Sequence, residues 1–101
     1  LPRDITLTSI DGRNRTAHSF VIAVVSPMIA AAINNTAMKE NKIFNLGCSI
    51  DLVDWFIDGA YNSEFVFDEK IDHDDGLKLL SYLMIINPAV TITQIRDTLE
   101  I

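Results

Sequence analysis

Cysteine, glycine, proline and long apolar runs are all scarce in this chain. Its 101 residues include one cysteine, four glycines and three prolines. A single thiol, Cys48, cannot form an internal disulfide or a multi-thiolate metal site, which favours a reducing compartment. No apolar run reaches the ~20 residues that span a bilayer, because Ser26-Pro27 interrupts the longest one, and no signal peptide is visible. We therefore expect an intracellular protein, cytoplasmic or nuclear, with no membrane contact.

Basic residues are also few. The chain has eight Lys and Arg against fourteen Asp and Glu, a formal net charge of −6. Nucleic acids and anionic membranes select for basic patches, so this balance argues against both as partners. Residues 1–50 hold five basic and three acidic residues, a sum of +2, whereas residues 51–101 hold three and eleven, a sum of −8. The acidic half is either a solvated helical surface, which is the favoured interpretation, or a docking face for a basic partner.

The remaining composition is that of a globular domain. Hydrophobic residues make up 49% of the chain and charged residues 22%, and the length suits one domain, residues 1–101. Hydrophobic periodicity predicts both strands and helices, and hence an α+β fold. The predicted strands are 4–9, 13–17, 42–46 and 65–67, with a turn at Asp11-Gly12 between the first two. The predicted helices are 19–25, a second from Pro27 to about Asn34, 50–61, a fourth that starts at 72–75, and a last one from a Thr91/Gln94 capping box.

Two serines are predicted helix caps. Ser26 precedes Pro27, whose missing N–H costs nothing at the first helical position, and Ser49 precedes the helix 50–61. Apolar residues at strand and helix spacing form the predicted core: Leu7, Val21, Ile22, Ile29, Ile33, Val53, Phe56, Ile57, Leu80 and Leu83.

Candidate catalytic and metal-binding residues are sparse. His18 lies between a predicted strand and helix and is interpreted as a hydrogen-bonded structural residue. His73 lies in Asp72-His73-Asp74-Asp75, whose donors could hold a divalent metal, but helix capping by the acids is the favoured interpretation. Cys48 has no neighbouring base and is interpreted as a core or strand-end residue. We expect no catalysis, no cofactor and no metal.

The predicted helix 50–61 carries two features of interest. Asp51, Asp54 and Asp58 share one face, which is interpreted as solvated rather than as a carboxylate site. Trp55 and Tyr61 lie on the same helix. If exposed they would be anchors for a partner protein, and if buried they belong to the core, which is the favoured interpretation for both.

The order of several motifs resembles that of BTB/POZ domains. They are Asp4-Ile5 before a strand, the Gly12 turn, a strand ending in Ala17-His18, then Val21-Ile22-Ala23, Ser26-Pro27, a long helix at 49–61, Tyr61-Asn62-Ser63-Glu64 and a helix at 79–85. Elongin C and the F-box-carrying ubiquitin-ligase adaptor share that fold. The resemblance implies a small three-stranded sheet packed on about five to six helices. It also implies that the domain works by binding other proteins.

The sequence departs from the family pattern in ways that bear on function. Arg15 stands where an aromatic residue is usual, and Ser19 stands where a basic residue usually follows the histidine. In the family's transcriptional repressors that base pairs with the early aspartate. Asp4 therefore lacks the basic partner that the family places directly after the histidine, which argues against a co-repressor role. The helix that usually precedes this aspartate and builds the exchanged dimer is not seen before Asp4, which argues against that dimer.

One short motif indicates a partner. Many BTB/POZ domains that act as ubiquitin-ligase adaptors carry an apolar–any–acid motif that inserts into a cullin, and Met38-Lys39-Glu40 fits it. An ordinary solvated loop is the alternative. With Tyr61, these are the candidate partner-binding residues; Asp4, His18, Ser26 and Pro27 are the family's structural motif. The leading hypothesis is a substrate adaptor that binds a cullin. A self-association domain of a scaffold or transcription regulator is the first alternative, and a small metal-binding or enzymatic domain is the second.

Overall fold

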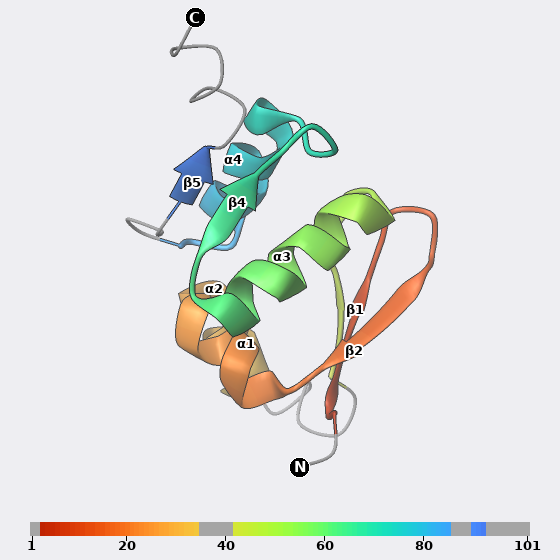
Figure 1. Ribbon diagram of the computed structural model, residues 1–101. Coiled ribbons are helices and arrows are strands. Elements are labelled where there is room, and N and C mark those ends of the chain that lie inside the picture. Colours follow the sequence, from red (N-terminus) through yellow and green to blue (C-terminus); the bar gives the residue numbers. More distant parts are fainter. Residues whose placement is uncertain (1–2, 35–41, 86–89, 93–101) are drawn as a thin grey trace, which may run out of the picture.

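The computed structural model describes residues 3–34, 42–85 and 90–92 as a small α+β domain (Figure 1). The strands are β1 (Ile5–Thr8), β2 (Asn14–Ala17), β3 (Ile43–Asn45), β4 (Phe65–Phe67) and β5 (Val90–Ile92). The helices are α1 (Ser19–Val25), α2 (Pro27–Asn34), α3 (Ile50–Asn62) and α4 (His73–Tyr82). The described residues thus contain four of the five to six helices expected. None of these four is long and apolar enough to cross a membrane.

β1 is the central strand of the predicted three-stranded sheet, whose order is β2-β1-β3. It pairs antiparallel with β2 and parallel with β3. Strand alternation places Ile5, Leu7 and Ser9 on the buried side. The Ser9 N–H donates to the Arg13 carbonyl at 2.9 Å, and Gly12 turns the chain at φ +85°, which glycine adopts without strain. The predicted hairpin is confirmed.

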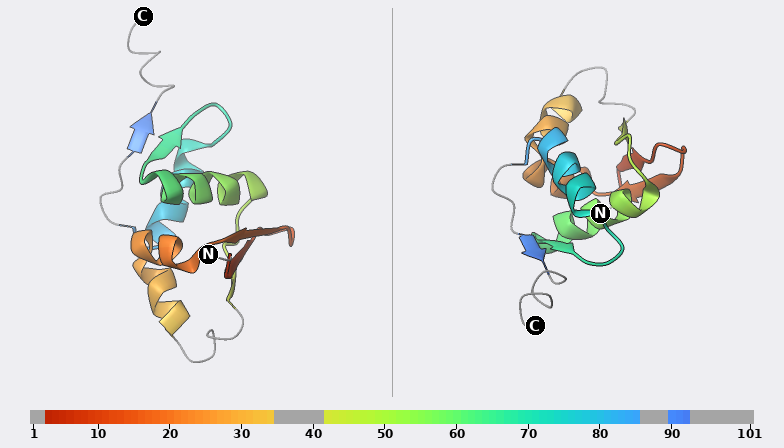
Figure 2. Two further views of the ribbon diagram at one scale, coloured as in Figure 1. Left: turned by 60° about the horizontal axis from the view of Figure 1, so that its bottom comes forward. Right: turned by 90° about the horizontal axis from the view of Figure 1, so that it is seen from above.

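α3 is the central helix of the fold. It lies between the three-stranded sheet on one side and the segment with β4 and α4 on the other (Figures 1 and 2). Ser49 is its N-cap, as predicted, and accepts a hydrogen bond from the Leu52 N–H at 3.3 Å. The helix ends at Ser63, which has the left-handed φ of 57° typical of a helix terminus. Because neighbours flank it on two sides, six of its thirteen residues are buried.

The core lies around α3 and largely matches the prediction. Seven of the ten predicted residues are buried, and Val21, Ile33 and Ile57 are partly buried against them. The main addition is an aromatic cluster. The Trp55 ring lies 5.3 Å from that of Phe65 and 5.0 Å from that of Phe67, and the Trp55 indole N–H donates to the Val66 carbonyl at 2.8 Å. The core interpretation of Trp55 is therefore confirmed.

The prediction of a last helix is wrong where that helix was to begin. Val90–Ile92 forms β5, which pairs in parallel with β4 in a second, two-stranded sheet. The local Thr91/Gln94 capping pattern was outweighed by three consecutive β-branched residues, which fit beside the free edge of β4. Residues 93–101, which were to carry the rest of that helix, lie outside the described residues.

Candidate interaction site

The sequence-predicted partner motif, Met38-Lys39-Glu40, lies outside the described residues. The structure places its two flanks, since α2 ends at Asn34 and β3 begins at Ile43. The other candidate residues, Asp4, His18, Ser26, Pro27 and Tyr61, are all described. They fall into two hydrogen-bonded groups and a helix junction, which together set the position of α1.

Asp4 does have a basic partner, Lys42, although the residue after the histidine is Ser19 and not the family's base. Its carboxylate accepts hydrogen bonds from the Ser19 N–H at 2.7 Å and the Ser19 hydroxyl at 2.6 Å. The Lys42 ammonium lies 3.2 Å from the same carboxylate. The cation comes from a distant part of the chain because the Thr6 N–H bonds to the Lys42 carbonyl beside the parallel β1–β3 pair. Sequence reasoning missed Lys42 since nothing local indicates that pairing.

These contacts stabilise the ionised form of Asp4. The hydrogen bond from the Ser19 hydroxyl, followed by that from the Ser19 N–H, lowers the pKa of the carboxyl well below its ordinary value. The side chain remains 42% exposed, so water weakens the effect on stability. The contacts of Asp4 with Ser19 and Lys42 therefore orient the start of β1 and of α1 relative to each other, and they contribute little to the free energy of unfolding.

Asp4→Asn is expected to destabilise the domain at neutral pH by less than ~1 kcal/mol, because the amide keeps the shape but loses the charge. A carboxyl with a lowered pKa contributes stability above its ordinary pKa of 3.8 and loses it as the pH falls further. The difference between the two proteins in urea unfolding should therefore shrink below about pH 4. Asp58→Asn, on the exposed side of α3, is the matched control. A difference that stays constant with pH would contradict the assignment.

His18 and Tyr61 form the second group. The Tyr61 hydroxyl accepts from the His18 backbone N–H at 2.9 Å and lies 2.6 Å from His18 Nδ1. The structural interpretation of His18 is confirmed. The core interpretation of Tyr61 is wrong, since the side chain is 40% exposed. Its position at the end of α3 leaves part of the ring in solvent while the hydroxyl holds the start of α1, so only the ring is open to a partner.

Ser26 and Pro27 form the predicted helix junction. The buried Ser26 hydroxyl accepts from the Ile29 N–H at 3.2 Å, and Pro27 is the first residue of α2. The same hydroxyl donates to the Leu83 carbonyl at 2.8 Å. One side chain therefore caps α2 and links it to the end of α4. Only the first of these two roles could be predicted from the sequence.

Arg15, which stands where the family usually has an aromatic residue, forms an ion pair. Its guanidinium lies 2.7 Å from the Asp54 carboxylate and makes two hydrogen bonds to it. This joins β2 to the acidic face of α3 and neutralises the middle one of the three aligned aspartates. Asp51 and Asp58 are exposed on the same helix, as the solvated-face interpretation expects.

Two apolar side chains of α1 are exposed. Phe20 is 55% exposed and Val24 is 82% exposed, and a spacing of four places them on one helix face. Only Ile22 is fully buried in this seven-residue helix. Exposed apolar side chains that cluster on one element are typical of a docking surface.

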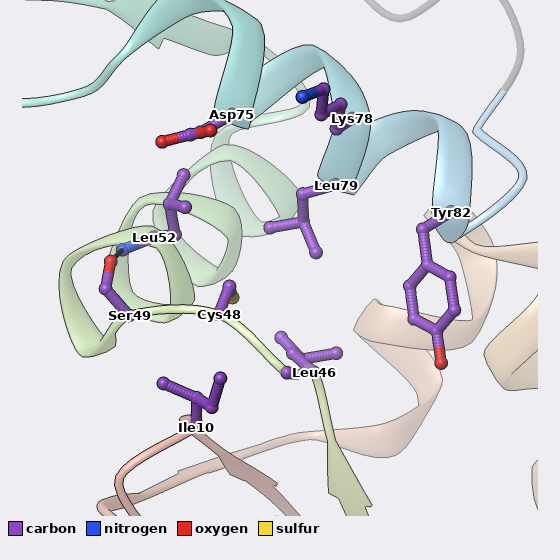
Figure 3. Close-up of a pocket in the computed structure, with 10 residues that line it drawn as sticks. Ile10, Leu46, Cys48, Ser49, Leu52, Asp75, Lys78, Leu79 and Tyr82 are labelled. Carbon is purple, nitrogen blue, oxygen red and sulfur yellow. Dashed lines mark hydrogen bonds between the residues drawn. The ribbon is translucent and has the colours of Figure 1, made fainter.

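A hollow of about 420 Å³ opens beside the turn between β1 and β2. Leu46, Leu52 and Leu79 extend into it, with the Cys48 thiol between them (Figure 3). Asp75, Lys78 and Tyr82 of α4 line one side and Ile10 lines the other. Burial raises the pKa of the Cys48 thiol, which disfavours the reactive thiolate. The thiol therefore contributes packing surface to the hollow, close to the expected strand-end role.

Asp72 and His73, in the histidine–aspartate stretch, both make contacts within the fold. Asp72 caps α4 by accepting from the Asp75 N–H at 3.1 Å, as the capping interpretation predicts. The centroid of the His73 ring lies 4.4 Å from that of Phe67, with the two rings tilted by 51°. Among residues 3–34, 42–85 and 90–92, no three His, Cys, Asp or Glu side chains lie together as a metal site.

Comparison with known proteins gives no relative. No protein-family model, curated protein or solved structure matches the chain significantly. The resemblance to BTB/POZ domains therefore stays a prediction.

Proposed function

We propose that this chain is a non-catalytic protein–protein interaction domain, and more narrowly an adaptor that binds the cullin scaffold of a ubiquitin ligase. The observation that supports an interaction domain is the exposed face of α1, where Phe20 and Val24 are left in solvent. A two-turn helix with this face uncovered would otherwise be a liability for solubility. Cullins act inside the cell, so the proposal places the domain in the cytoplasm or nucleus.

The narrower proposal rests on Met38-Lys39-Glu40 and on the order of elements. The hairpin, the two short helices joined at Ser26-Pro27, the third strand and the long α3 follow the succession that the BTB/POZ resemblance implies. The motif falls between α2 and β3, where the family's cullin anchor is expected. Met38 would enter an apolar slot on the cullin, and Glu40 would contribute specificity and association rate.

The double change Met38→Ala with Glu40→Ala should weaken cullin binding by at least ~tenfold. Burying a methionine-sized side chain is worth ~1.5–3 kcal/mol, and 1.4 kcal/mol corresponds to a factor of ten. The measurement is biolayer interferometry of the intact and variant domains against a panel of cullin N-terminal domains. Thermal unfolding of the same samples should be unchanged, because the residues lie between elements.

Lys39→Ala is the matched control, since the motif accepts any residue at its middle position. Equal losses from Lys39→Ala and from the double change would indicate a nonspecific effect of the loop. If the intact domain binds no cullin of the panel, the adaptor proposal fails and the motif is a plain connector.

Self-association is the second candidate, and the α1 face favours it because an apolar helix face suits a second copy as well as a foreign partner. The substitution Val24→Asp distinguishes self-association from cullin binding. It should dissociate a dimer formed through α1 and leave cullin binding through residues 38–40 unchanged.

A further inference from the structure

An exposed apolar side chain, Ile10, lines the hollow beside the β1–β2 turn. Ile10 stands in a tight turn, where polar residues are usual, and 72% of it is exposed. It adjoins an apolar floor formed by Leu46, Leu52 and Leu79, which line the hollow and are otherwise almost completely buried (Figure 3). A protruding apolar group and an apolar recess therefore lie next to each other on one face of the molecule.

The same face carries two charges of opposite sign. Asp75 and Lys78 are both exposed on α4, three residues apart, and both line the hollow. Within the described part of the chain neither side chain forms an ion pair. An acidic or a basic partner would satisfy one of them and repel the other.

A second copy of the chain satisfies both. In a two-fold pair the same patch lies on each side of the interface, so a protrusion must fit the recess and each charge must meet its opposite. This face holds the protruding Ile10, the apolar recess and both charges, Asp75 and Lys78. We propose that two copies pair through it about a two-fold axis, with Ile10 of each copy covering the hollow of the other and Asp75 facing Lys78 of the second copy. The pairing is independent of the α1 face and of residues 38–40.

The pair is expected to be weak, because the face is small and each copy has a net charge of −6. Small interfaces of this kind are transient, so sedimentation velocity is run from about 10 µM to about 1 mM. The intact chain should move from monomer toward dimer across this range, with no larger species. Alkylation of Cys48, the only thiol, should slow in parallel as the hollow is covered.

Charge exchange gives the sharpest test. Asp75→Lys or Lys78→Asp alone should raise the dissociation constant at least ~fivefold, because each places like charges face to face. An equal mixture of these two variants should associate again, since every contact is then between opposite charges. The double variant, Asp75→Lys with Lys78→Asp, should also return to within about twofold of the intact chain. If the single substitutions weakened the association only by disturbing the fold, neither the mixture nor the double variant would restore it.

Ile10→Asp should abolish the pairing, and its melting midpoint verifies that the exposed turn residue leaves the fold intact. Val66→Asp is the control, because Val66 is an exposed apolar residue on β4 that does not line the hollow. The proposal is overturned if the intact chain stays monomeric at the highest concentration. It is also overturned if association depends on Val24 and not on Ile10, or if the mixed charge variants fail to pair.

Discussion

Phe56→Ala should lower the free energy of unfolding by ~3–5 kcal/mol, the largest effect expected of any substitution considered for this domain. The Phe56 side chain is completely buried in α3, and its ring stacks against Phe65 at 6.1 Å between centroids. Removing the ring leaves a cavity in the core, and the surrounding elements can relax only partly to fill it. Urea unfolding followed by circular dichroism measures the loss.

Phe20→Ala is the matched control, because it deletes the same atoms from a side chain that is mostly exposed. Its cost should stay within about 1 kcal/mol. Equal costs at the two positions would show that α3 does not occupy the centre of the fold.

Gly59→Ala should also destabilise the domain, by ~1–3 kcal/mol, although the same change in an exposed helix interior gains ~1 kcal/mol. Gly59 lies in the last turn of α3, where a Cβ atom would overlap the ring of Phe65. The ring cannot turn aside freely, because it is buried between Trp55 and Phe56. The sign of the effect, read from thermal and urea unfolding, is the decisive result.

A second substitution identifies the cause. Phe65→Leu removes the ring that the new methyl group would meet, so the cost of Gly59→Ala should shrink in that background. Asp58→Ala, on the exposed side of the same helix, reports the effect of alanine where no neighbour is close. If Gly59→Ala stabilises the protein, the contact between α3 and β4 is looser than the structure indicates.

Most of the fold up to α4 could be predicted from the sequence, because its determinants are local. Ser26-Pro27, Ser49 and Asp72 each lie directly before the helix they cap, and Gly12 follows the strand that it turns. The alternation of Ile5 and Leu7 assigns the buried face of β1 without knowledge of its neighbours. Such signals depend on spacings of four residues or fewer, which a single sequence displays directly.

The parts that could not be predicted depend on contacts between distant residues. Lys42 reaches Asp4 only because β3 pairs in parallel with β1, and no periodicity encodes that pairing. The strand at Val90 needs the free edge of β4, some twenty-five residues earlier, and so was taken for the start of a helix. Tyr61 follows the apolar spacing of α3 but lies beyond the elements that would cover it. The hollow at Cys48 joins three segments, and sequence spacing alone indicates none of its shape.

The place of β1 in the middle of its sheet has a consequence for biosynthesis. Of the three strands in this sheet, β1, which both neighbours require, leaves the ribosome first, and its second neighbour, β3, follows only after both short helices have been made. Until Asn45 emerges, one edge of the β1–β2 hairpin has no strand beside it and is open to other chains. Completion of the sheet is thus a late event that closes a long loop, and for a domain of this size such closure sets the pace of folding.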